Sequence, residues 1–400
     1  MADTPKIRFK GFTDEWEQRK LGELFEERNE QYPMSKDYPL MAFIANIGVA
    51  PKGERYDRSA LVNDEKGKKY KRTERGDFIY SSNNLEAGSI GLNDYGNACI
   101  SPVYSIFKSK NNANSGFLGS VLLRKELINA MIQYRQGVVY GQWKIHENDF
   151  LNLEIAVPEL CEQKKIGEYF KHLDRLIIFH QRKCEETIKL KKYMLQKMFP
   201  QNDKKIPEIR FEGFTDEWEQ CRLGELGTIQ TCKRVFKEQT SEIGDIPFYK
   251  NGTIGLKADA FISRKLFEEY KELYPYPEVG DILISAVGSI GRIAEYTGKD
   301  EYFQDSNVVW LKTDDRINKK FLKISYQIIE WLIEGSTVKH LYNDNILKSE
   351  ITMPCSQKEQ ERIGDYFETI DHLITLHQHK CKELKEVKKF MLQNMFPQKG

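Results

Sequence analysis

The longest regular pattern of apolar and polar positions along this chain is helical, and it occurs twice. Between Glu162 and Gln201, and again between Glu359 and Gln398, apolar or semi-polar residues recur at alternating steps of four and three. This spacing is the heptad seam of a helix that packs against another helix. The seam positions are Ile166, Phe170, Leu173, Ile177, His180, Cys184, Thr187, Lys191, Met194 and Met198 in the first copy, and Ile363, Phe367, Ile370, Ile374, His377, Cys381, Leu384, Lys388, Met391 and Met395 in the second.

We therefore predict two long helices, Glu162 to Phe199 and Glu359 to Phe396, each followed by a proline that stops it. A helix of about 37 residues is about 55 Å long at 1.5 Å per residue, so each needs a partner. The repeat is the sequence of matching length and seam, so we pair the two as an intramolecular coiled coil. An antiparallel pair would give approximate two-fold symmetry, and a parallel pair stays open on the sequence alone. Ser356 and Glu359 have the spacing of a capping box at the start of the second helix.

Shorter patterns fill the stretches between these helices. The runs GDFIYSS, GDILISAVGSIGRIAEY and NVVWLKT are β-branched or aromatic and have the length of strands, whereas FLGSVLLRKELINAMIQYR and FLKISYQIIEWLIEG are typical of amphipathic helices. Glycine-bearing loops at Gln136 to Ile145 and Glu334 to Asn343 each precede a short apolar strand. The fold class is therefore α+β, with two tandem pseudo-repeated halves, each a mixed α/β domain plus a long helix.

Two repeated segments set the architecture. The segment from Ile7 to Leu24 returns from Ile209 to Leu226 with 15 of 18 positions identical, and the two long-helix segments share 23 of 40 positions. The stretches between them match only at GDFIYS and GDILIS and at two copies of GSIG, beginning at Gly88 and Gly288. The repeats divide the chain into an N-terminal arm at 1–24, a first variable domain at 25–158, a central framework helix at 159–202, a repeated arm at 203–226, a second variable domain at 227–354 and a C-terminal framework helix at 355–400.

This arrangement favours a framework that holds a common partner twice while the variable domains recognise two different things. The alternative, that the variable domains drifted without functional reason, stays open on the repeats alone.

Composition narrows the class of protein. The 400 residues carry 61 basic and 60 acidic side chains, for a net charge of +1, so the net charge does not by itself indicate a nucleic-acid partner. Mean hydropathy is -0.60. The sequence contains no apolar run of membrane-spanning length and no signal-peptide pattern, so we expect a cytoplasmic protein. Seven cysteines without a CxxC pair fit reduced thiols.

The search for catalytic motifs is mostly negative. The sequence has no GxGxxG or Walker A loop, no NPPY-like tetrapeptide of an amino-methyltransferase, no HExxH and no GxSxG. The two GSIG segments could cradle a phosphate or form plain hairpin turns. His180 with Cys184 and His377 with Cys381 have helical spacing and could meet as a zinc set in an antiparallel pair, but packed or register-setting seam residues explain them better.

Candidate DNA-binding residues come from local clusters of basic and hydrogen-bonding side chains, which can contact phosphates and base edges. Such clusters are often only solvated surface. The candidates are Lys68, Lys69, Lys71, Arg72, Ser89, Tyr140, Gln142 and Lys144 in the first variable domain, and Lys250, Asn251, Ser289, Arg292, Ser336, Thr337, Lys339 and His340 in the second.

The order of these motifs resembles the specificity (S) subunit of type I restriction-modification systems over the whole chain. The resemblance rests on GFTDEW and LGEL in the arms, GDILIS and GSIG in the variable domains, and helices that begin EQKKIG and end MLQKMFPQ. It implies two target recognition domains, each reading one half of a bipartite site in double-stranded DNA. It also implies an antiparallel coiled coil that spaces these domains and docks two modification (methyltransferase) subunits, with restriction (motor nuclease) subunits joining them.

The resemblance further implies that this chain is not an enzyme and binds no cofactor, while S-adenosylmethionine, ATP and Mg²⁺ are bound by the partners. It does not identify base-contacting residues, because members of the family differ there. Two other classes stay open: an enzyme with its own DNA chemistry, and a coiled-coil scaffold that binds only protein.

Overall fold

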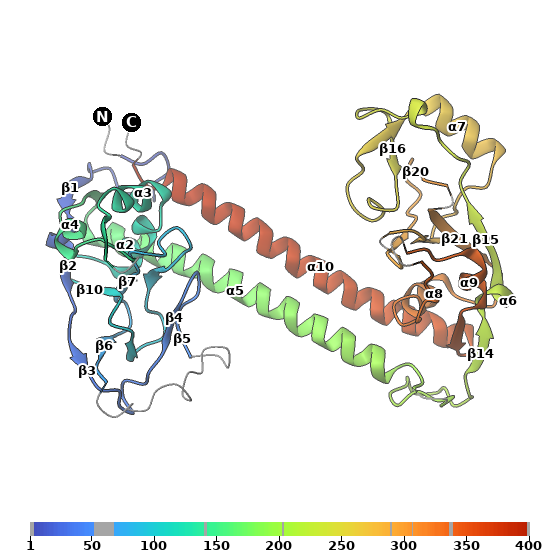
Figure 1. The fold of residues 1–400 in the computed structure, drawn as a ribbon, viewed down its shortest axis with the longest axis horizontal. Helices are drawn as coiled ribbons and strands as arrows, with labels where there is room; N and C mark the ends of the chain where they lie inside the picture. The colour runs from blue at the N-terminus through green and yellow to red at the C-terminus, as the bar shows by residue number, and fades with distance from the viewer. Residues whose placement is uncertain are drawn as a thin grey trace. The chain divides into compact units, whose positions relative to one another are not determined.

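A computed structural model describes residues 4–51, 68–139, 142–201, 204–288, 290–305, 307–335 and 339–397. The chain forms two compact units (Figure 1). Unit 1 consists of Met1–Gln181 with Gln378–Gly400, and unit 2 consists of Arg182–His377. Each long helix therefore contributes one half to each unit.

The two long helices form where the heptad pattern predicts them. Helix α5 spans Leu160–Lys197 and helix α10 spans Gln357–Asn394, so each begins and ends two residues before the predicted limits. In unit 1, Lys388 Nζ lies 2.5 Å from Asp174 Oδ1, and in unit 2 Lys191 Nζ lies 2.6 Å from Asp371 Oδ1. Because the earlier residue of α5 pairs with the later residue of α10, the helices run antiparallel (Figure 1). The parallel alternative is wrong.

Unit 1 is built on a four-stranded antiparallel sheet in the order β2-β10-β7-β8. These strands are Phe25–Glu27, Ser105–Ser109, Phe78–Tyr80 and Ile90–Leu92. Smaller sheets pair β1 (Glu17–Lys20) with β13 (Glu154–Val157), β3 (Gln31–Tyr32) with β6 (Tyr70–Thr73) and β9 (Ala98–Ile100), β4 (Ala42–Ile44) with β5 (Gly48–Ala50), and β11 (Gln136–Val139) with β12 (Gln142–Lys144). The shorter helices are α1 (Leu21–Leu24), α2 (Ser115–Leu122), α3 (Lys125–Gln133) and α4 (Glu147–Leu151).

Unit 2 repeats this central sheet in the order β15-β21-β18-β19. These strands are Gly227–Thr231, Val308–Thr313, Ile282–Ser285 and Ile293–Glu295. A second sheet joins β17 (Ala260–Ile262), β16 (Ile246–Tyr249) and β20 (Tyr302–Phe303), and β14 (Glu219–Arg222) pairs with β22 (Glu350–Met353). The shorter helices are α6 (Leu223–Leu226), α7 (Arg264–Leu273), α8 (Lys319–Ser325), α9 (Asn343–Lys348) and the 3-10 turn η3 (Lys237–Gln239). The predicted α+β class is confirmed.

One predicted helix is shorter than its apolar pattern suggests. The run from Phe321 to Gly335 is helical only to Ser325, where α8 ends. The N–H groups of Ile328 and Ile329 both donate to the Ser325 carbonyl and close a turn. Further along, the side chain of Asn345 donates to the Leu332 carbonyl, so tertiary contacts replace helical hydrogen bonds.

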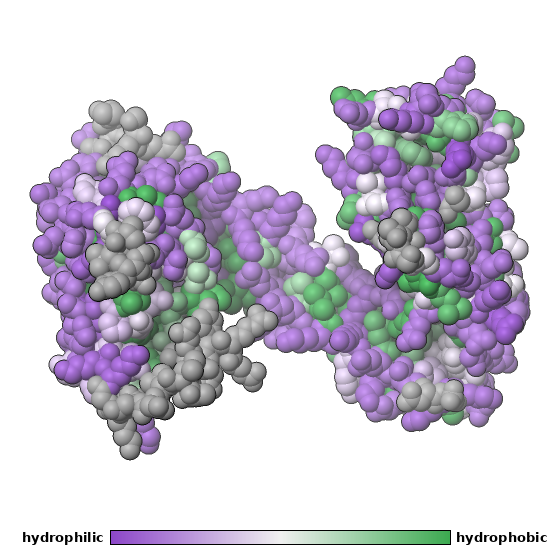
Figure 2. All heavy atoms as spheres, in the orientation of Figure 1, coloured by the Kyte–Doolittle hydropathy of each residue, from purple (hydrophilic) through white to green (hydrophobic). Residues whose placement is uncertain are grey.

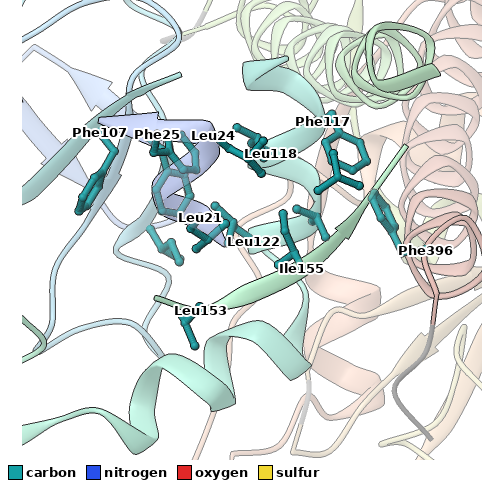
Figure 3. Close-up of a cluster of buried hydrophobic side chains, with 14 of the residues drawn as sticks. Leu21, Leu24, Phe25, Phe107, Phe117, Leu118, Leu122, Leu153, Ile155 and Phe396 are labelled. Carbon is teal, nitrogen blue, oxygen red and sulfur yellow. The ribbon is translucent and has the colours of Figure 1, made fainter. Parts of the chain in front are cut away.

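The end of each long helix is built into a hydrophobic core. In unit 1, Phe396 lies just beyond α10 and is 1% exposed, with its ring centroid 5.8 Å from Phe117 and 5.9 Å from Phe170 (Figure 3). In unit 2, Phe199 lies beyond α5 and contacts the rings of Trp218 and Phe321 in the same way. The repeated MFP motif therefore plugs a core in each unit.

A repeated Glu-Gln pair fastens the arm and the variable domain to the start of each long helix. Glu162 is fully buried and accepts two 2.8 Å hydrogen bonds from Arg8 in the arm. Gln163 accepts from the backbone N–H of Asn114 at the start of α2 and donates to the Pro158 carbonyl.

The same joint recurs in unit 2 with Glu359, Arg210, Gln360 and Asn318. Glu359 also accepts from the Trp218 indole at 3.3 Å, so its carboxylate is engaged with the arm. The capping-box role suggested by its distance from Ser356 is not what the carboxylate does here.

Candidate nucleic-acid interface

In unit 2, three segments far apart in the sequence meet at one surface, which we call loop face 2. It comprises the described parts of residues 250–253, 286–292 and 334–340. The side chain of Asn251 donates to the Val287 carbonyl at 2.9 Å, and Gly288 N donates to the Lys339 carbonyl at 3.3 Å. Arg292 donates to the Gly252 carbonyl at 2.9 Å. The structure thus brings Asn251, Arg292 and Lys339, which the sequence singles out separately, onto one face.

Loop face 2 carries side chains that can meet DNA. Lys339 is exposed, and the imidazole of His340 stacks on Tyr342 with ring centroids 5.6 Å apart and planes 11° apart. Lys250 forms a 3.1 Å ion pair with Asp259, and both side chains are substantially exposed. An exposed ion pair is weak and exchanges readily for a phosphate contact.

In unit 1 the equivalent surface, loop face 1, comprises the described parts of residues 44–48, 82–89 and 135–145. The hairpin β11-β12 docks on the second of these segments. Trp143 N donates to Asn83 Oδ1 at 2.6 Å, and Ile145 N donates to Ser82 Oγ at 3.0 Å. The side chains of Trp143 and Lys144 are exposed, so this face presents an aromatic and a basic group together.

Other candidates in unit 1 lie in different surroundings. Ser89 is 7% exposed, and its N–H and carbonyl bond to Asn84 and Ser81, so it supports the loop from inside. Lys71 is 6% exposed and donates to the Tyr104 carbonyl, and burial lowers the pKa of its ammonium. Neither side chain is offered to a ligand in this structure.

The remaining basic candidates of unit 1 lie on and beside β6. The Arg72 guanidinium stands over Tyr32 and Tyr38, with ring centroids 4.2 and 4.5 Å away, which holds it in one orientation. Lys68 lies 5.8 Å from the Tyr70 ring, and both Lys68 and Lys69 are exposed.

Five candidates cannot be placed as side chains. Tyr140, Ser289, Ser336 and Thr337 lie outside the described residues, and Gln142 is described only as backbone in β12.

Sequence reasoning missed three residues of these faces: Asn46, Asn83 and Trp143. Asn46 has a left-handed backbone with φ 61°, and its side chain donates to the Ala87 carbonyl at 3.3 Å. The sequence feature that could have indicated Asn46 is the recurrence of GSIG in two otherwise divergent domains. A loop sequence kept in both domains suggests that another residue of the same domain packs against it.

Three other expectations concern metal, thiols and the membrane. Within the described ranges, no group of three or more His, Cys, Asp or Glu side chains is arranged to hold a metal ion. All seven cysteines fall in those ranges and are free thiols there. Among the described helices, none is long and apolar enough to span a membrane.

Comparison with known proteins decides the family. The model of the type I restriction modification DNA specificity domain matches twice, at residues 13–190 and 215–386. The chain belongs to the type I restriction-modification specificity-subunit family. Each match begins in an arm and ends in a long helix, so this specificity subunit has two recognition domains in tandem.

Relatives of this specificity subunit agree with the match. A putative type I restriction enzyme specificity subunit of Haemophilus influenzae is 35% identical over 315 residues, which are 76% of this chain and 78% of that protein. The MjaVIII specificity subunit of Methanocaldococcus jannaschii is 25% identical over 266 residues, 60% of each chain. A crystal structure of the type I S subunit from M. genitalium has the same fold, with a TM-score of 0.66 and 14% identity over 99% of this chain and all of that one.

Proposed function

We propose that this specificity subunit reads a bipartite site in double-stranded DNA, with loop face 1 contacting one half-site and loop face 2 the other. One observation carries the proposal: the two faces are held on the same framework but present different side chains. Lys144 pairs with Gln136 in unit 1, and His340 pairs with Glu334 in unit 2, so Lys144 and His340 occupy corresponding positions. By the same register, Trp143 in unit 1 corresponds to Lys339 in unit 2. Equal scaffolds with different contact groups fit two different half-sites.

The near-neutral net charge fits a division of labour. Lysine and imidazole groups on the loop faces supply local phosphate or base contacts, and partner subunits add the rest of the grip on the backbone. Because the sequence lacks the catalytic motifs of a methyltransferase or nuclease, the chain is not catalytic in this proposal. S-adenosylmethionine, ATP and Mg²⁺ are bound by its partners in this proposal.

The exposed apolar side chains of the long helices support docking of two modification subunits, one on each unit. Hydrophobic residues gather on the visible face of the helices (Figure 2). The large exposed apolar or aromatic side chains of α5 and α10 are Ile178, Phe179, Val387 and Phe390 in unit 1, and Ile188, Leu190, Tyr193, Leu373 and Leu376 in unit 2. Large exposed apolar side chains of this kind are typical of protein interaction sites. Restriction subunits join the complex formed in this way.

The docking proposal is tested by charge on one unit at a time. Phe179→Glu with Phe390→Glu changes unit 1, and we expect native mass spectrometry to show one bound modification subunit instead of two. Lys385→Glu, an exposed position on the same part of α10, is the matched control and leaves two bound. Two bound subunits in the double variant would contradict docking at this surface.

The DNA-reading proposal is tested by mapping methylation in cells that contain this chain and its modification subunits. Lys144→Ala and Lys339→Ala should each change recognition of one half-site only. A phosphate contact predicts weaker binding across sequences with a shallower salt dependence, and a base contact predicts relaxed specificity at one position, worth about 1–3 kcal/mol. Lys108 and Lys312, exposed lysines on the matching strands β10 and β21, supply control alanine variants.

Three outcomes would overturn the proposal. Unchanged affinity and sequence preference in both variants would remove the loop faces from the interface. A gap of variable length between the half-sites would contradict spacing by the paired helices. Methyl transfer by the isolated chain, at the rate of the complex, would show an enzyme instead.

A further inference from the structure

One hydrogen bond occurs in both recognition domains although the residues around it differ. Asn46 Nδ2 donates to the Ala87 carbonyl in unit 1, and Asn251 Nδ2 donates to the Val287 carbonyl in unit 2. Each acceptor comes immediately before the Gly-Ser-Ile-Gly segment. The asparagines come from unlike turns: Asn46 lies between β4 and β5, and Asn251 follows β16.

The glycine that follows each acceptor makes room for the asparagine. Gly88 and Gly288 have φ +87° and +69°, a conformation that side chains rarely adopt. A Cβ on Gly88 would overlap the amide of Asn46, and a Cβ on Gly288 would lie 3.3 Å from Asn251 Nδ2. The shared GSIG sequence is therefore explained by a shared seat for an asparagine, and not by a phosphate cradle alone.

Both asparagines are held within the protein by further hydrogen bonds. Asn46 N donates to the Gly88 carbonyl at 3.0 Å. Asn251 Oδ1 accepts from Gly252 N at 2.9 Å, and Asn251 N donates to Gln304 at 3.3 Å. These bonds use one of the two N–H donors of the Asn251 amide and one lone pair of its oxygen, so they anchor the side chain in the loop. The proposal below gives Asn251 this positioning role in place of the direct contact with DNA expected from the sequence.

A second hydrogen bond, at the base of each hairpin segment, also recurs in both units, but the residues that supply its amide and its carboxylate are exchanged. In unit 1, Gln136 Nε2 donates to Asp149 Oδ2 at 3.3 Å, and in unit 2, Asn345 Nδ2 donates to Glu334 Oε1 at 2.8 Å. The amide and the carboxylate have traded places. Each hairpin segment is thus tied to the helix that follows it, α4 or α9, by one amide–carboxylate pair.

We propose that Asn46 and Asn251 are positioning residues for DNA specificity, acting with the pairs Gln136–Asp149 and Glu334–Asn345. The asparagine fixes the GSIG loop against the body of its domain. In unit 2 the loop in turn holds the strand that carries the contact groups, because Gly288 N donates to the Lys339 carbonyl. In unit 1 the corresponding strand is held by the turn that leads into the loop: Trp143 N donates to Asn83 Oδ1, and Ser89 N in the loop donates to the Asn84 carbonyl. A shift of the loop therefore shifts the side chains that meet the base edges.

This inference rests on the proposed function, since it assigns a role in reading half-sites. It makes a sharper claim, that specificity in each half-site depends on a residue that does not contact DNA. A positioning residue, when replaced, shifts the side chains that contact DNA, whereas a contact residue, when replaced, removes a bond to DNA.

The experiment uses the full chain co-expressed with its modification subunits, and methylation is mapped across the host genome. Asn251→Asp keeps the size of the side chain but sets a carboxylate against the Val287 carbonyl in place of an N–H donor. We expect about a fivefold or greater loss of discrimination at one or more positions of a single half-site, the size that one lost hydrogen bond gives. Asn46→Asp should do the same in the other half-site, so each variant is the control for the other.

Two further variants guard against a merely structural effect. Asn29→Asp adds the same charge at an exposed position of unit 1 and should leave both half-sites unchanged. Gln136→Glu sets two carboxylates against each other and should relax the half-site of unit 1. Adding Asp149→Asn recreates the arrangement of Glu334 and Asn345, and this double variant should recover discrimination.

Each outcome decides. If Asn46→Asp and Asn251→Asp keep full discrimination while Lys339→Ala relaxes its half-site, the positioning role is refuted and the proposed function stands. If the asparagine variants lower methylation at all sites in proportion to a lower melting temperature, the residues are structural only, and the positioning role is again refuted. If Lys144→Ala, Lys339→Ala and both asparagine variants all leave the recognised sequence unchanged, the proposed function of the loop faces fails as well.

Discussion

Replacement of Phe396 by alanine should loosen unit 1, although this residue is only four positions from the end of the 400-residue chain. Its ring is 1% exposed and packs edge-on against Trp16, with centroids 6.1 Å apart, as well as on Phe117 and Phe170. Truncation of a fully packed phenylalanine costs about 3–5 kcal/mol.

We expect a loss of about 4 kcal/mol, near the middle of this range. The Arg124 guanidinium lies 5.3 Å from the Phe396 ring and is 8% exposed, so the cavity would leave a buried cation without the ring beneath it. Phe396→Leu retains much of the apolar surface and should cost about 1–2 kcal/mol.

Hydrogen–deuterium exchange of the full chain measures this effect unit by unit. Peptides that cover α1 and β2 report unit 1, and peptides that cover α6 and β15 report unit 2. A loss of about 4 kcal/mol corresponds to about a thousandfold faster exchange of amides that open only with the whole unit. Phe199→Ala is the matched variant and should act on the unit 2 peptides instead. An increase below about tenfold in unit 1, or an equal increase in both units, would refute the reasoning that the chain end belongs to the core of unit 1.

Three further predictions concern the framework and the thiols. Arg8→Met should destabilise its unit by about 3 kcal/mol in denaturant unfolding, because it leaves a buried carboxylate unpaired, and Arg210→Met should cost less since Trp218 still donates to Glu359. Gly364→Ala should lower the melting temperature, with a loss of about 1–3 kcal/mol of stability, because the new methyl group would overlap Lys320 and crowd Phe321 at the start of α8. In Gly11→Ala the new methyl group meets nothing within 4 Å, so this control tests the strain of a positive φ alone. Iodoacetamide at pH 8 should modify Cys355 before Cys232, because burial raises the pKa of the Cys232 thiol to about 12 and removes it from solvent, and equal rates would contradict this.

The long helices and the duplication could be predicted from the sequence because they depend on periodicity and identity, which are local properties. The functions of single charged residues could not. Lys71 lies in a basic run, yet β6 is the middle strand of its sheet and turns this side chain inward while Arg72 points the other way. The register of β6 determines which of the two side chains is buried, and a run of basic residues does not reveal that register.

The same limit applies to contacts made across the fold. Glu359 has the spacing of a capping group, but a guanidinium 149 positions away in the sequence claims its carboxylate. Asn46 and Asn251 lie at different distances from the GSIG segments that they hold, so no fixed spacing could reveal them. Residues of this kind emerge only when the turns and loops are seen together.

The division of each long helix between the two units has a consequence for synthesis on the ribosome. Unit 2 ends at His377, so all of its residues have been made while unit 1 still lacks Met395 and Phe396. Although the N-terminal domain usually folds first, the core of the first recognition domain is complete only after Met395 and Phe396 have been translated. At about 5–20 residues per second, the interval between the completion of β13 and the arrival of Phe396 is about 10–50 s. Throughout that time the aromatic core around Trp16 and Phe117 lacks the Phe396 ring, so we expect the nascent chain to need chaperone protection at unit 1 more than at unit 2.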